Sequence, residues 1–454
     1  LIPVYNVASA KLLLMAGVGK GSGSSSGSND GGIKEVDDSQ LTGVPVGRLE
    51  GIPDGPLTLP SPASSSTTWA VCDDINYNPD MPTQVAQQGV QTYVLAGVSN
   101  LGQQLPDPDT AYVAGPDGKD YLIYSQQHNV NNENDSDVRA AVDTGNSAVM
   151  TALGLTSAHP RQISAALLNA IPYVGQITNP IASYVDHPET TPGLPVAPGL
   201  PFMVQRSSTE YDYYIALPTG VEQVSEAVAE IARFANPSSA QNIQVAVPGQ
   251  VDNLPQLQND PLGVKYYPGN ITTNGQIEAG TDQTMCLGWT ADYGNPNQPI
   301  AHTSIFLNHG ISQVLPADKD NQTGKMAPVQ IGTPAPNGIK IDYFLMNSPA
   351  VGDGITVHAA TNAGEFVNGP IYIVSARGTK YSVPDMKTAQ ALGVSSSSPP
   401  QYGIWPAPQS ILGLLPTAQQ DLSVQSVQRS YDTLSVPANA GQYAPPPTST
   451  QGGS

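Results

Sequence analysis

The stretch Ile371-Tyr-Ile-Val-Ser-Ala-Arg-Gly-Thr-Lys-Tyr-Ser-Val-Pro-Asp-Met-Lys-Thr-Ala-Gln-Ala-Leu-Gly393 joins two apolar runs to a short helical pattern. Both runs are rich in β-branched and aromatic residues, and the turn residues 376–379 between them predict a β-hairpin. Asp385 is a good N-cap for a helix that begins at Met386, and Gly393 is a good residue to end it. A second helical turn at 411–416 ends at a proline. This hairpin-plus-helix unit decides the fold, because it recurs.

Three degenerate copies of the unit precede it in the chain. The copies contain predicted strands at 110–114, 119–124, 201–204 and 211–217, and predicted helices at 9–14, 148–154, 163–172 and 226–232. Ala152-Leu-Gly154 and Ala391-Leu-Gly393 stand at matching places in two of the copies. In the first copy, we expect the first strand to lie before Leu1. Units of this size bury little apolar surface alone, so we expect them to pack against a common core.

The sequence between the copies predicts that core, because it contains short strand patterns separated by Gly and Pro. The predicted strands lie at 243–247, 303–307, 329–331, 339–345 and 355–357. We therefore predict an α+β, β-rich protein of elongated shape, with four small repeats around a discontinuous central β core. Its predicted parts are repeat 1 (1–60), core segment 1 (61–109), repeat 2 (110–190), repeat 3 (200–248), core segment 2 (249–369), repeat 4 (370–425) and a Pro/Ser-rich tail (426–454).

The chain has two cysteines, Cys72 and Cys286, and each lies close to a tryptophan. Their separation excludes a CxxC redox or zinc motif. A nucleophilic cysteine would need a histidine in register, which the sequence does not indicate. The alternative is a structural disulfide in an oxidising compartment, which stabilises by roughly 4–5 kcal/mol through loop closure. We predict the disulfide, which would link the two core segments.

Composition limits the classes of partner. Lys and Arg number 17 against 37 Asp and Glu, a net charge of −20, and this argues against nucleic-acid binding. The longest apolar run near the start, residues 12–18, is too short to span a membrane, which takes about 20 residues. Since the chain begins at Leu1 rather than Met, we expect a membrane anchor or signal in front of it.

Three motifs with a catalytic appearance have simpler explanations. Gly23-Ser-Ser-Ser-Gly27 matches GxSxG, but it lies inside a Gly/Ser-rich loop rather than between a strand and a helix. Asp143-Thr-Gly145 resembles half of an aspartic protease site and has no second copy, so we expect it in the loop before the helix at 148–153. Neither Gly17-Val-Gly-Lys20 nor Gly324-Lys325 satisfies the phosphate-loop pattern.

Metal ligands are not indicated either. Asp73-Asp74 and Asp318-Lys-Asp320 could hold a hard cation, but neither continues as a calcium loop, and we expect solvated loop carboxylates. The histidines show no paired ligand spacing; they are His128, His159, His187, His302, His309 and His358. We predict no catalytic residue, no metal and no cofactor.

Three passages resemble EccB, the membrane-anchored component of actinobacterial type VII (ESX) secretion systems. Pro3-Val-Tyr-Asn-Val-Ala-Ser-Ala-Lys-Leu12 resembles the signature of the first repeat of that family. Ala152-Leu-Gly-Leu155 with 167–172 resembles the second repeat, and Lys380-Tyr-Ser-Val-Pro-Asp-Met386 with 414–416 resembles the fourth. The two cysteines beside tryptophans also resemble the family's disulfide. The resemblance extends to about residue 430, while the loops 20–32 and 125–147 are expanded and unusually polar.

The resemblance implies an extracytoplasmic domain on the periplasmic side of the inner membrane, behind one transmembrane helix. Its partners would be further copies of itself together with EccC, EccD, EccE and the mycosin protease. Some members are described as ATPases, so the alternatives are a structural assembly module and an enzyme, either a nucleotide hydrolase or a cell-wall-acting protein. As an assembly module, its repeats 1 and 4 should lie beside each other or near the membrane. We expect apolar residues there to be shared between core and partner: Leu12, Leu13, Leu14, Met386 and Leu392.

Overall fold

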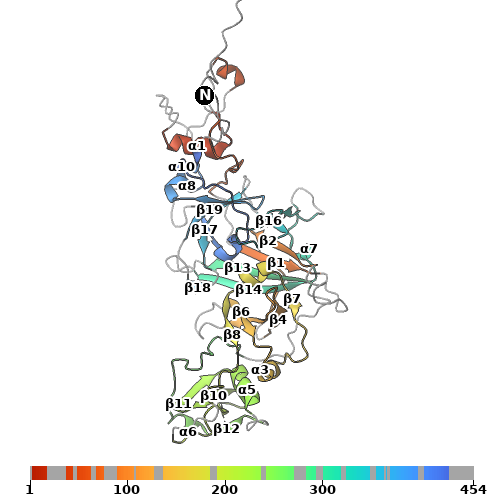
Figure 1. The fold of residues 1–454 in the computed structure, drawn as a ribbon, viewed down its shortest axis with the longest axis vertical. Coiled ribbons are helices and arrows are strands. Elements are labelled where there is room, and N and C mark those ends of the chain that lie inside the picture. Colours follow the sequence, from red (N-terminus) through yellow and green to blue (C-terminus); the bar gives the residue numbers. More distant parts are fainter. Residues whose placement is uncertain are drawn as a thin grey trace, which may run out of the picture.

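In a computed structural model, the molecule is elongated, and the chain travels along it and back (Figure 1). Repeats 1 and 4 lie at one end, the central sheet lies in the middle, and repeats 2 and 3 follow in that order toward the other end. The structure describes residues 3–17, 37–43, 49–62, 68–75, 89–106, 109–126, 136–184, 192–236, 242–269, 283–292, 300–318, 324–347, 354–361, 364–365, 369–396 and 403–428. The Gly/Ser loop 20–32, with its GxSxG match, and most of the tail lie outside these ranges.

The central sheet has the strand order β15-β16-β2-β1-β13-β14-β18, and β3 pairs with β14. Its strands are β1 (Thr68–Asp74), β2 (Gln91–Ala96), β3 (Gln103–Gln104), β13 (Thr284–Asp292), β14 (Ile300–Asn308), β15 (Val329–Gln330), β16 (Tyr343–Met346) and β18 (Gly364–Glu365). Both predicted core segments contribute strands, so the discontinuous β core is confirmed. A helical turn, α7 (Ile311–Val314), follows β14.

The predicted disulfide joins the two middle strands of this sheet. Cys72 on β1 and Cys286 on β13 are directly opposite each other in the antiparallel register, with Cα atoms 4.0 Å apart. Both residues are fully buried. The bond therefore closes a loop of 214 residues that contains repeats 2 and 3.

The two faces of the central sheet have different cover. Because side chains alternate along a strand, Trp69 and Val71 lie on one face of β1 while Cys72 lies on the other. The tryptophan face is covered by two short helices that lie side by side, α4 (Ala165–Ala170) of repeat 2 and α9 (Gln409–Leu412) of repeat 4. The second helix of each of these two repeats thus buries its apolar side against the core, as the small size of the repeats required.

Repeats 2, 3 and 4 share one topology. Three antiparallel strands are followed by a helix and by a fourth strand that pairs in parallel with the first. A fifth segment then runs parallel to the third strand, as β8 in repeat 2 and as single bridges in the other two, at Val221–Gln256 and Lys380–Thr417. The bridge between Val4 and Glu50, on either side of helix α1 (Val7–Met15), is the same feature in repeat 1.

The elements of the repeats have the following bounds. Repeat 2 contains β4 (Ala111–Ala114), β5 (Asp120–Gln126), β6 (Ser136–Val142), α3 (Ser147–Ala152), β7 (Arg161–Gln162), α4 and β8 (Tyr173–Ile177). Repeat 3 contains β9 (Pro201–Gln205), β10 (Tyr211–Leu217), β11 (Gly220–Val224), α5 (Glu226–Ala235), β12 (Gln244–Ala246) and α6 (Pro248–Val251). The sheet of repeat 4 contains β17 (Gly354–Ala360), β19 (Ile371–Ser375), β20 (Lys380–Val383) and β21 (Trp405–Pro408), with helices α8 (Met386–Leu392), α9 and α10 (Val424–Val427) nearby. Repeat 1 contains α1 and the 3-10 turn η1 (Asp38–Leu41).

Two strands differ from the sequence prediction. The strand predicted at 355–357 in the core is β17, which pairs with β19 and β21 and so begins the sheet of repeat 4. The strand β12, whose pattern at 243–247 was counted with the core strands, pairs with β9 and so lies within the predicted bounds of repeat 3, 200–248. Part of the predicted loop 125–147 is the strand β6, in which Asp137 is buried. The burial of this carboxylate is compensated by a hydrogen bond from the backbone N–H of Ile305, at 2.5 Å.

The predicted helix ends in repeat 4 are confirmed. The Asp385 side chain accepts a hydrogen bond from the N–H of Thr388, and Gly393 ends α8 with a left-handed φ of 74°. In repeat 2, the residue that caps α3 is Asn146, whose side chain accepts from the N–H of Ala148 and Val149. Asp143 lies in the turn before it, where the N–H of Asn146 donates to its carbonyl at 3.1 Å.

Repeats 1 and 4 lie beside each other and share one hydrophobic core. Helix α1 packs on α8 and α10, and the shared cluster combines Leu12 and Ile52 from one repeat with Ile373 and Leu392 from the other. Lys11 Nζ also donates to the carbonyl of Leu392 at the end of α8, at 2.8 Å. Lys11 and Leu392 are 381 residues apart in the sequence, so these contacts join the two ends of the described chain. They confirm that repeats 1 and 4 are neighbours.

Candidate interaction surfaces

The apolar residues that we expected to be shared between core and partner are mostly core. Leu12, Leu13 and Leu392 are at most 5% exposed and lie in the cluster that joins repeats 1 and 4. Leu14 and Met386 are half-buried, and Met386 packs against the same cluster. These side chains support the fold, so the surface that meets a partner has to be sought elsewhere.

Exposed large hydrophobic side chains gather at the two ends of the molecule. Of the ten that are exposed among the described residues, four belong to repeat 1 and four to repeat 3. They are Tyr5, Val7, Leu49 and Leu57 in repeat 1, and Tyr211, Phe234, Val245 and Val247 in repeat 3. Leu57 and Val247 are the most exposed, at 67% and 65%. Exposed apolar residues that are scattered singly are ordinary, whereas contiguous apolar patches mark interaction sites.

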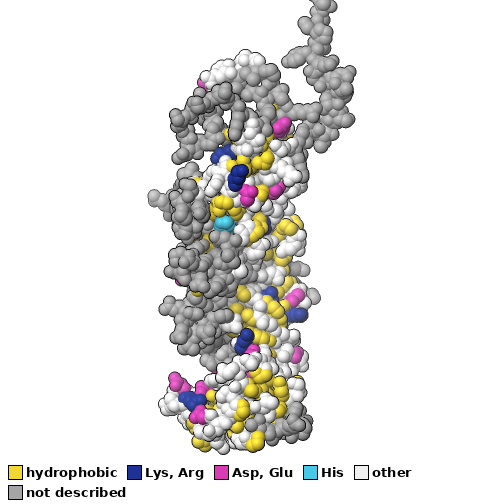
Figure 2. Space-filling model, turned by 90° about the vertical axis from the view of Figure 1, so that its left-hand side faces the viewer, with side chains coloured by type: hydrophobic (Ala, Val, Ile, Leu, Met, Phe, Trp, Pro, Cys, Tyr) yellow, Lys and Arg dark blue, Asp and Glu magenta, His cyan; other side chains and the backbone are white. Residues whose placement is uncertain are grey.

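Charged side chains are sparse over much of the described surface. Figure 2 shows one face of the molecule, on which hydrophobic side chains are spread along the length and the few charged ones are scattered. The strand β12 adds an open edge at the far end, because in the described residues its only sheet neighbour is β9. Val245 on this strand is 54% exposed. Open edges with apolar side chains can pair with another chain.

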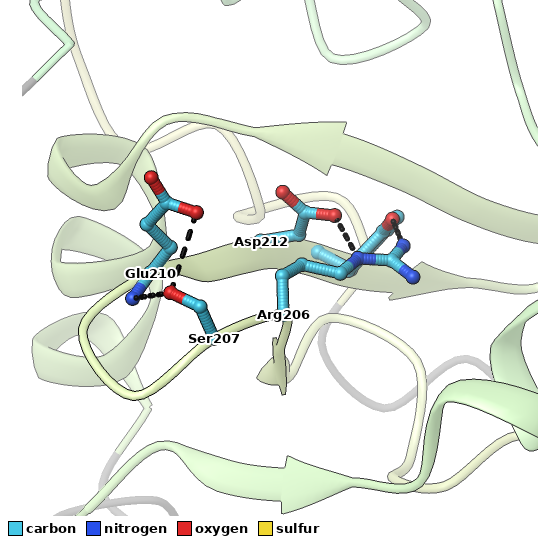
Figure 3. A network of polar contacts seen from close by, with 5 residues as sticks. Arg206, Ser207, Glu210 and Asp212 are labelled. Carbon is cyan, nitrogen blue, oxygen red and sulfur yellow. Dashed lines mark hydrogen bonds and ion pairs between the residues drawn. The ribbon is translucent and has the colours of Figure 1, made fainter.

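A polar network closes the β9–β10 hairpin of repeat 3 (Figure 3). Arg206 Nε contacts Asp212 Oδ2 at 2.5 Å, and Arg206 Nη2 donates to the hydroxyl of Tyr214 at 3.2 Å. Ser207 Oγ accepts from the N–H of Glu210 at 3.2 Å and donates to its carboxylate at 3.3 Å. The Arg206 side chain is 40% exposed, so solvent screens the ion pair and the pair adds little stability. The main effect of the network is to fix the shape of the hairpin.

The pair Asp73-Asp74 was predicted to be solvated, and this is wrong for Asp73. Asp73 lies in β1 and is fully buried, and its carboxylate accepts from Thr92 Oγ1 at 2.9 Å, Ser164 N at 2.6 Å and Ser164 Oγ at 2.8 Å. Burial raises the pKa of Asp73, while these hydrogen bonds and the charge of Arg161 oppose the rise. Because Ser164 is the N-cap of α4, Asp73 ties repeat 2 to the core and is not a free cation ligand.

Within the described ranges, no helix is long and apolar enough to cross a membrane. The apolar run at 12–18 falls largely in α1, which covers only nine residues and packs its leucines into the protein.

A family model described as "Type VII secretion system ESX-1, transport TM domain B" matches residues 1–436. The chain belongs to the EccB family. The ESX-2 secretion system ATPase EccB2 of Mycobacterium tuberculosis is 25% identical over 377 residues, which cover 82% of this chain and 69% of that protein. The ESX-3 secretion system ATPase EccB3 of Mycolicibacterium smegmatis is 26% identical over 451 residues, covering 97% and 76%.

Solved structures have the same fold. One is the EccB3 dimer from the ESX-3 core complex, with a TM-score of 0.67, 24% identity and coverage of 94% of both chains. Another is an intact ESX-5 inner membrane complex described with threefold symmetry, with a TM-score of 0.66, 22% identity and coverage of 98% and 80%. The resemblance of the sequence to EccB is thereby confirmed. The structure of this chain also contains the predicted disulfide and the predicted β-rich repeats.

Since curated EccB relatives carry the name ATPase, the phosphate-loop candidates matter. Lys325 Nζ donates to the carbonyl of Leu315 at 2.8 Å, and Gly324 and Lys325 belong to a bridged turn rather than to the start of a helix. Gly17 ends the turn after α1, and residues 18–20 lie outside the described ranges. A phosphate loop requires a strand, a glycine-rich turn and a helix in succession, which Gly324-Lys325 lacks.

The histidines and remaining carboxylates are dispersed. In the part of the chain that the structure describes, no three of His, Cys, Asp and Glu gather as a metal site. His302 lies on β14 and His358 on β17, and burial lowers the pKa of both. His128, His187 and Asp320 lie outside the described residues.

Sequence reasoning missed the segment that ties repeat 3 to repeat 2. Residues 252–267, called the strap below, follow α6 and end in Lys265-Tyr-Tyr267. Val264 and Tyr267 pack into a cluster that contains residues of both repeats. The tyrosine pair was the available signal, because adjacent tyrosines in a segment otherwise rich in Asn, Asp and Pro are apolar surface that has to be buried somewhere.

Proposed function

We propose that this EccB chain is a structural component of the type VII secretion machinery. Its extracytoplasmic domain associates with further copies of itself and docks other subunits of the inner-membrane complex. By the family resemblance these subunits are EccC, EccD, EccE and the mycosin protease, and a transmembrane helix would hold the domain on the periplasmic side. The observation that carries the proposal is the grouping of exposed apolar side chains on repeats 1 and 3, at opposite ends of an elongated molecule.

The distribution of apolar residues supports assembly better than catalysis. An elongated molecule with exposed apolar side chains at both ends can contact two neighbours at once. The EccB3 dimer and the ESX-5 inner membrane complex are both assemblies of chains with this fold. They support a role for EccB folds in assembly, and they leave the surfaces used by this chain to experiment.

The proposal is tested by placing a charge on each end in turn. Leu57→Lys and Val247→Lys each put a cation where a large apolar side chain is about two-thirds exposed. Val329→Lys is the matched control, because Val329 is exposed at 40% on β15 of the central sheet, away from both ends. Sedimentation of the purified chain and recovery of the membrane complex from cells are the two readouts.

We expect at least one end variant to lower self-association or complex recovery tenfold or more, while circular dichroism stays unchanged. The Val329→Lys control should behave as the unmodified chain. If both end variants assemble as well as the control does, the ends are not interfaces and the proposal fails.

Hydrolysis of ATP is the second candidate, favoured by the names of the curated relatives. We propose that it is not intrinsic to this chain, because Lys325 is already bound to a backbone carbonyl and a net charge of −20 repels a triphosphate. Purified chain should release no phosphate above background. Activity that survives extensive purification and has a KM in the physiological range would overturn this.

A further inference from the structure

The strap, residues 252–267, is held by hydrogen bonds to both repeats that it connects. On the side of repeat 3, Val221 N donates to the carbonyl of Pro255 and Leu257 N donates to the carbonyl of Val221, both at 2.9 Å. On the side of repeat 2, the Tyr267 hydroxyl accepts from Thr178 N at 2.9 Å and donates to its carbonyl at 3.1 Å. If the strap moves, the two repeats lose a shared anchor.

Aromatic packing adds to this anchor. The Tyr266 hydroxyl donates to the carbonyl of Gln176 at 3.3 Å, and the Tyr124 hydroxyl donates to the carbonyl of Tyr266. Gly175 is required beside it, because a Cβ there would lie 2.8 Å from the Tyr266 ring, and its φ is 140°. The strap thus fixes how repeat 3 sits on repeat 2 through its two tyrosines.

A groove of about 380 Å³ lies between strand β11 and the strap. Glu222 of β11 lines the groove and is only 3% exposed. Its Oε2 accepts a hydrogen bond from Leu262 N at 3.2 Å, and the carboxyl of Asp260 lies beside it. Asp260 has a left-handed φ of 50°, and its carboxylate accepts from Val264 N at 2.7 Å and Lys265 N at 3.4 Å. Two carboxyls that organise the strap are therefore in contact.

We propose that Glu222, beside Asp260, is a proton-operated latch, which holds the strap on β11 when Glu222 is protonated and loosens it when Glu222 is ionised. A protonated Glu222 can donate a hydrogen bond to the half-exposed carboxyl of Asp260, whereas an ionised Glu222 is a buried negative charge next to a second acidic group. On ionisation Glu222 loses its hydrogen bond to Asp260, whereas the hydrogen bond from Leu262 N favours the ionised form and opposes the loosening. Loosening the strap would weaken the joint between repeats 2 and 3, in which α3 of repeat 2 also packs directly on α5 of repeat 3.

The surroundings of Glu222 favour a transition near neutral pH. Burial is the largest influence, and together with the hydrogen bond and charge of Asp260 it raises the pKa of Glu222 from 4.5 to about 7, against the opposing effect of the Leu262 N–H. The other titratable groups on the groove come from the strap, Lys265, which is exposed, and Tyr267. Strand β10 places the apolar Ile215 opposite Glu222.

The direction of the effect follows from proton binding. Since the folded latch has the raised pKa, it binds a proton between about pH 4.5 and pH 7 that the opened carboxyl would release. The hold of the latch is therefore complete below pH 4.5 and is lost as the pH rises through about 7.

Hydrogen exchange of the whole chain, corrected for intrinsic exchange rates, tests the latch. Protection of peptides covering 255–267 should fall ten- to a hundredfold between pH 5.5 and pH 8.5. Peptides from β13 in the central sheet should show no such change. In Glu222→Gln, the amide can accept from Leu262 N and donate to Asp260, so protection of the strap should stay high at every pH. Glu230→Gln, the same change on α5, is the control and should titrate as the unmodified chain does.

A second variant keeps the test decisive if Glu222→Gln does not fold. Asp260→Asn removes the neighbouring charge, and Asn both tolerates a positive φ and can accept from Val264 N. The midpoint of the loss of protection should move by at least half a pH unit in this variant. The latch is ruled out if the strap of the unmodified chain shows constant protection from pH 5.5 to 8.5. It is also ruled out if both variants titrate with the midpoint of the unmodified chain.

Discussion

Reduction of the Cys72–Cys286 disulfide should lower the free energy of unfolding of the central sheet by about 5 kcal/mol. The bond closes a loop of 214 residues, and the loop-closure entropy of a loop of this length corresponds to about 5 kcal/mol at 25 °C. The figure depends weakly on how much of the loop unfolds. If repeats 2 and 3 stayed folded and halved the flexible length, the stabilisation would fall by only about 0.6 kcal/mol.

Tryptophan fluorescence can report the unfolding of the central sheet. Trp69 and Trp289 lie on the same two strands as the cysteines, three residues away, and are at most 1% exposed. A Trp405→Phe background removes the signal of repeat 4, in which Trp405 lies on β21. Urea unfolding of the oxidised chain is then compared with that of the same chain in reductant, so that no side chain is deleted and the difference reports the cross-link alone.

The double variant Cys72→Ala with Cys286→Ala should be less stable than the reduced chain, because it also loses two buried sulfur atoms from the cluster on that face. Equal urea midpoints for the oxidised and reduced chains would refute the loop-closure reasoning. Free alkylation of both thiols in the native, unreduced protein would refute the disulfide itself.

Three further substitutions probe other joints. Asp73→Asn should destabilise the chain by roughly 2–4 kcal/mol, because an amide cannot replace a carboxylate that accepts three hydrogen bonds. Thermal unfolding measures this loss of stability, with the exposed substitution Asp252→Asn as the control. Gly220→Ala should cost about 1–3 kcal/mol and raise proteolysis of the strap, because its Cβ would lie 2.3 Å from the carbonyl oxygen of Pro255. Burial lowers the pKa of His358, so below pH 6.5 the unfolded chain binds a proton at this residue that the folded chain does not bind, and the unmodified chain loses stability. His358→Gln should therefore be more stable relative to the unmodified chain at pH 5 than at pH 8, as measured by denaturation of both proteins at the two pH values.

Local features of the repeats could be predicted because their signals are contiguous. In repeat 4, the hairpin, the Asp385 cap and the Gly393 terminator all lie within 23 residues of sequence, and each one acts on its immediate neighbours. The hairpins β4–β5 and β9–β10 were likewise located by strand patterns on either side of a turn. The disulfide could be predicted because the chain contains only two cysteines.

Pairings between distant segments could not be predicted in the same way. The strand β17 looks like any other buried strand, and its place in repeat 4 depends on its pairing with β19 and β21. Strand β6 contains the charged residues Asp137 and Arg139, which in the sequence alone indicate a loop. Asp137 can be buried in a strand only because the backbone N–H of Ile305, on β14, donates a hydrogen bond to it. Asp73 is misread for the same reason. A buried carboxylate is favourable only with its partners in place, and those partners come from other parts of the sequence.

The path of the chain explains why these distant contacts matter for an assembly module. The outgoing half runs from repeat 1 through β1 to repeats 2 and 3, and the returning half runs through the strap and β13 to repeat 4. Outgoing and returning segments are joined at three levels: by the core of repeats 1 and 4, by the disulfide between β1 and β13, and by the strap between repeats 2 and 3. The first joint is an apolar core and the second is a covalent bond, so neither responds to moderate changes in pH. The third combines apolar packing and the two tyrosines of the strap with the adjacent carboxyls Glu222 and Asp260. If Glu222 is the proton-operated latch, this is the joint whose strength changes with pH, and it lies next to the end of the molecule that carries the exposed apolar residues of repeat 3.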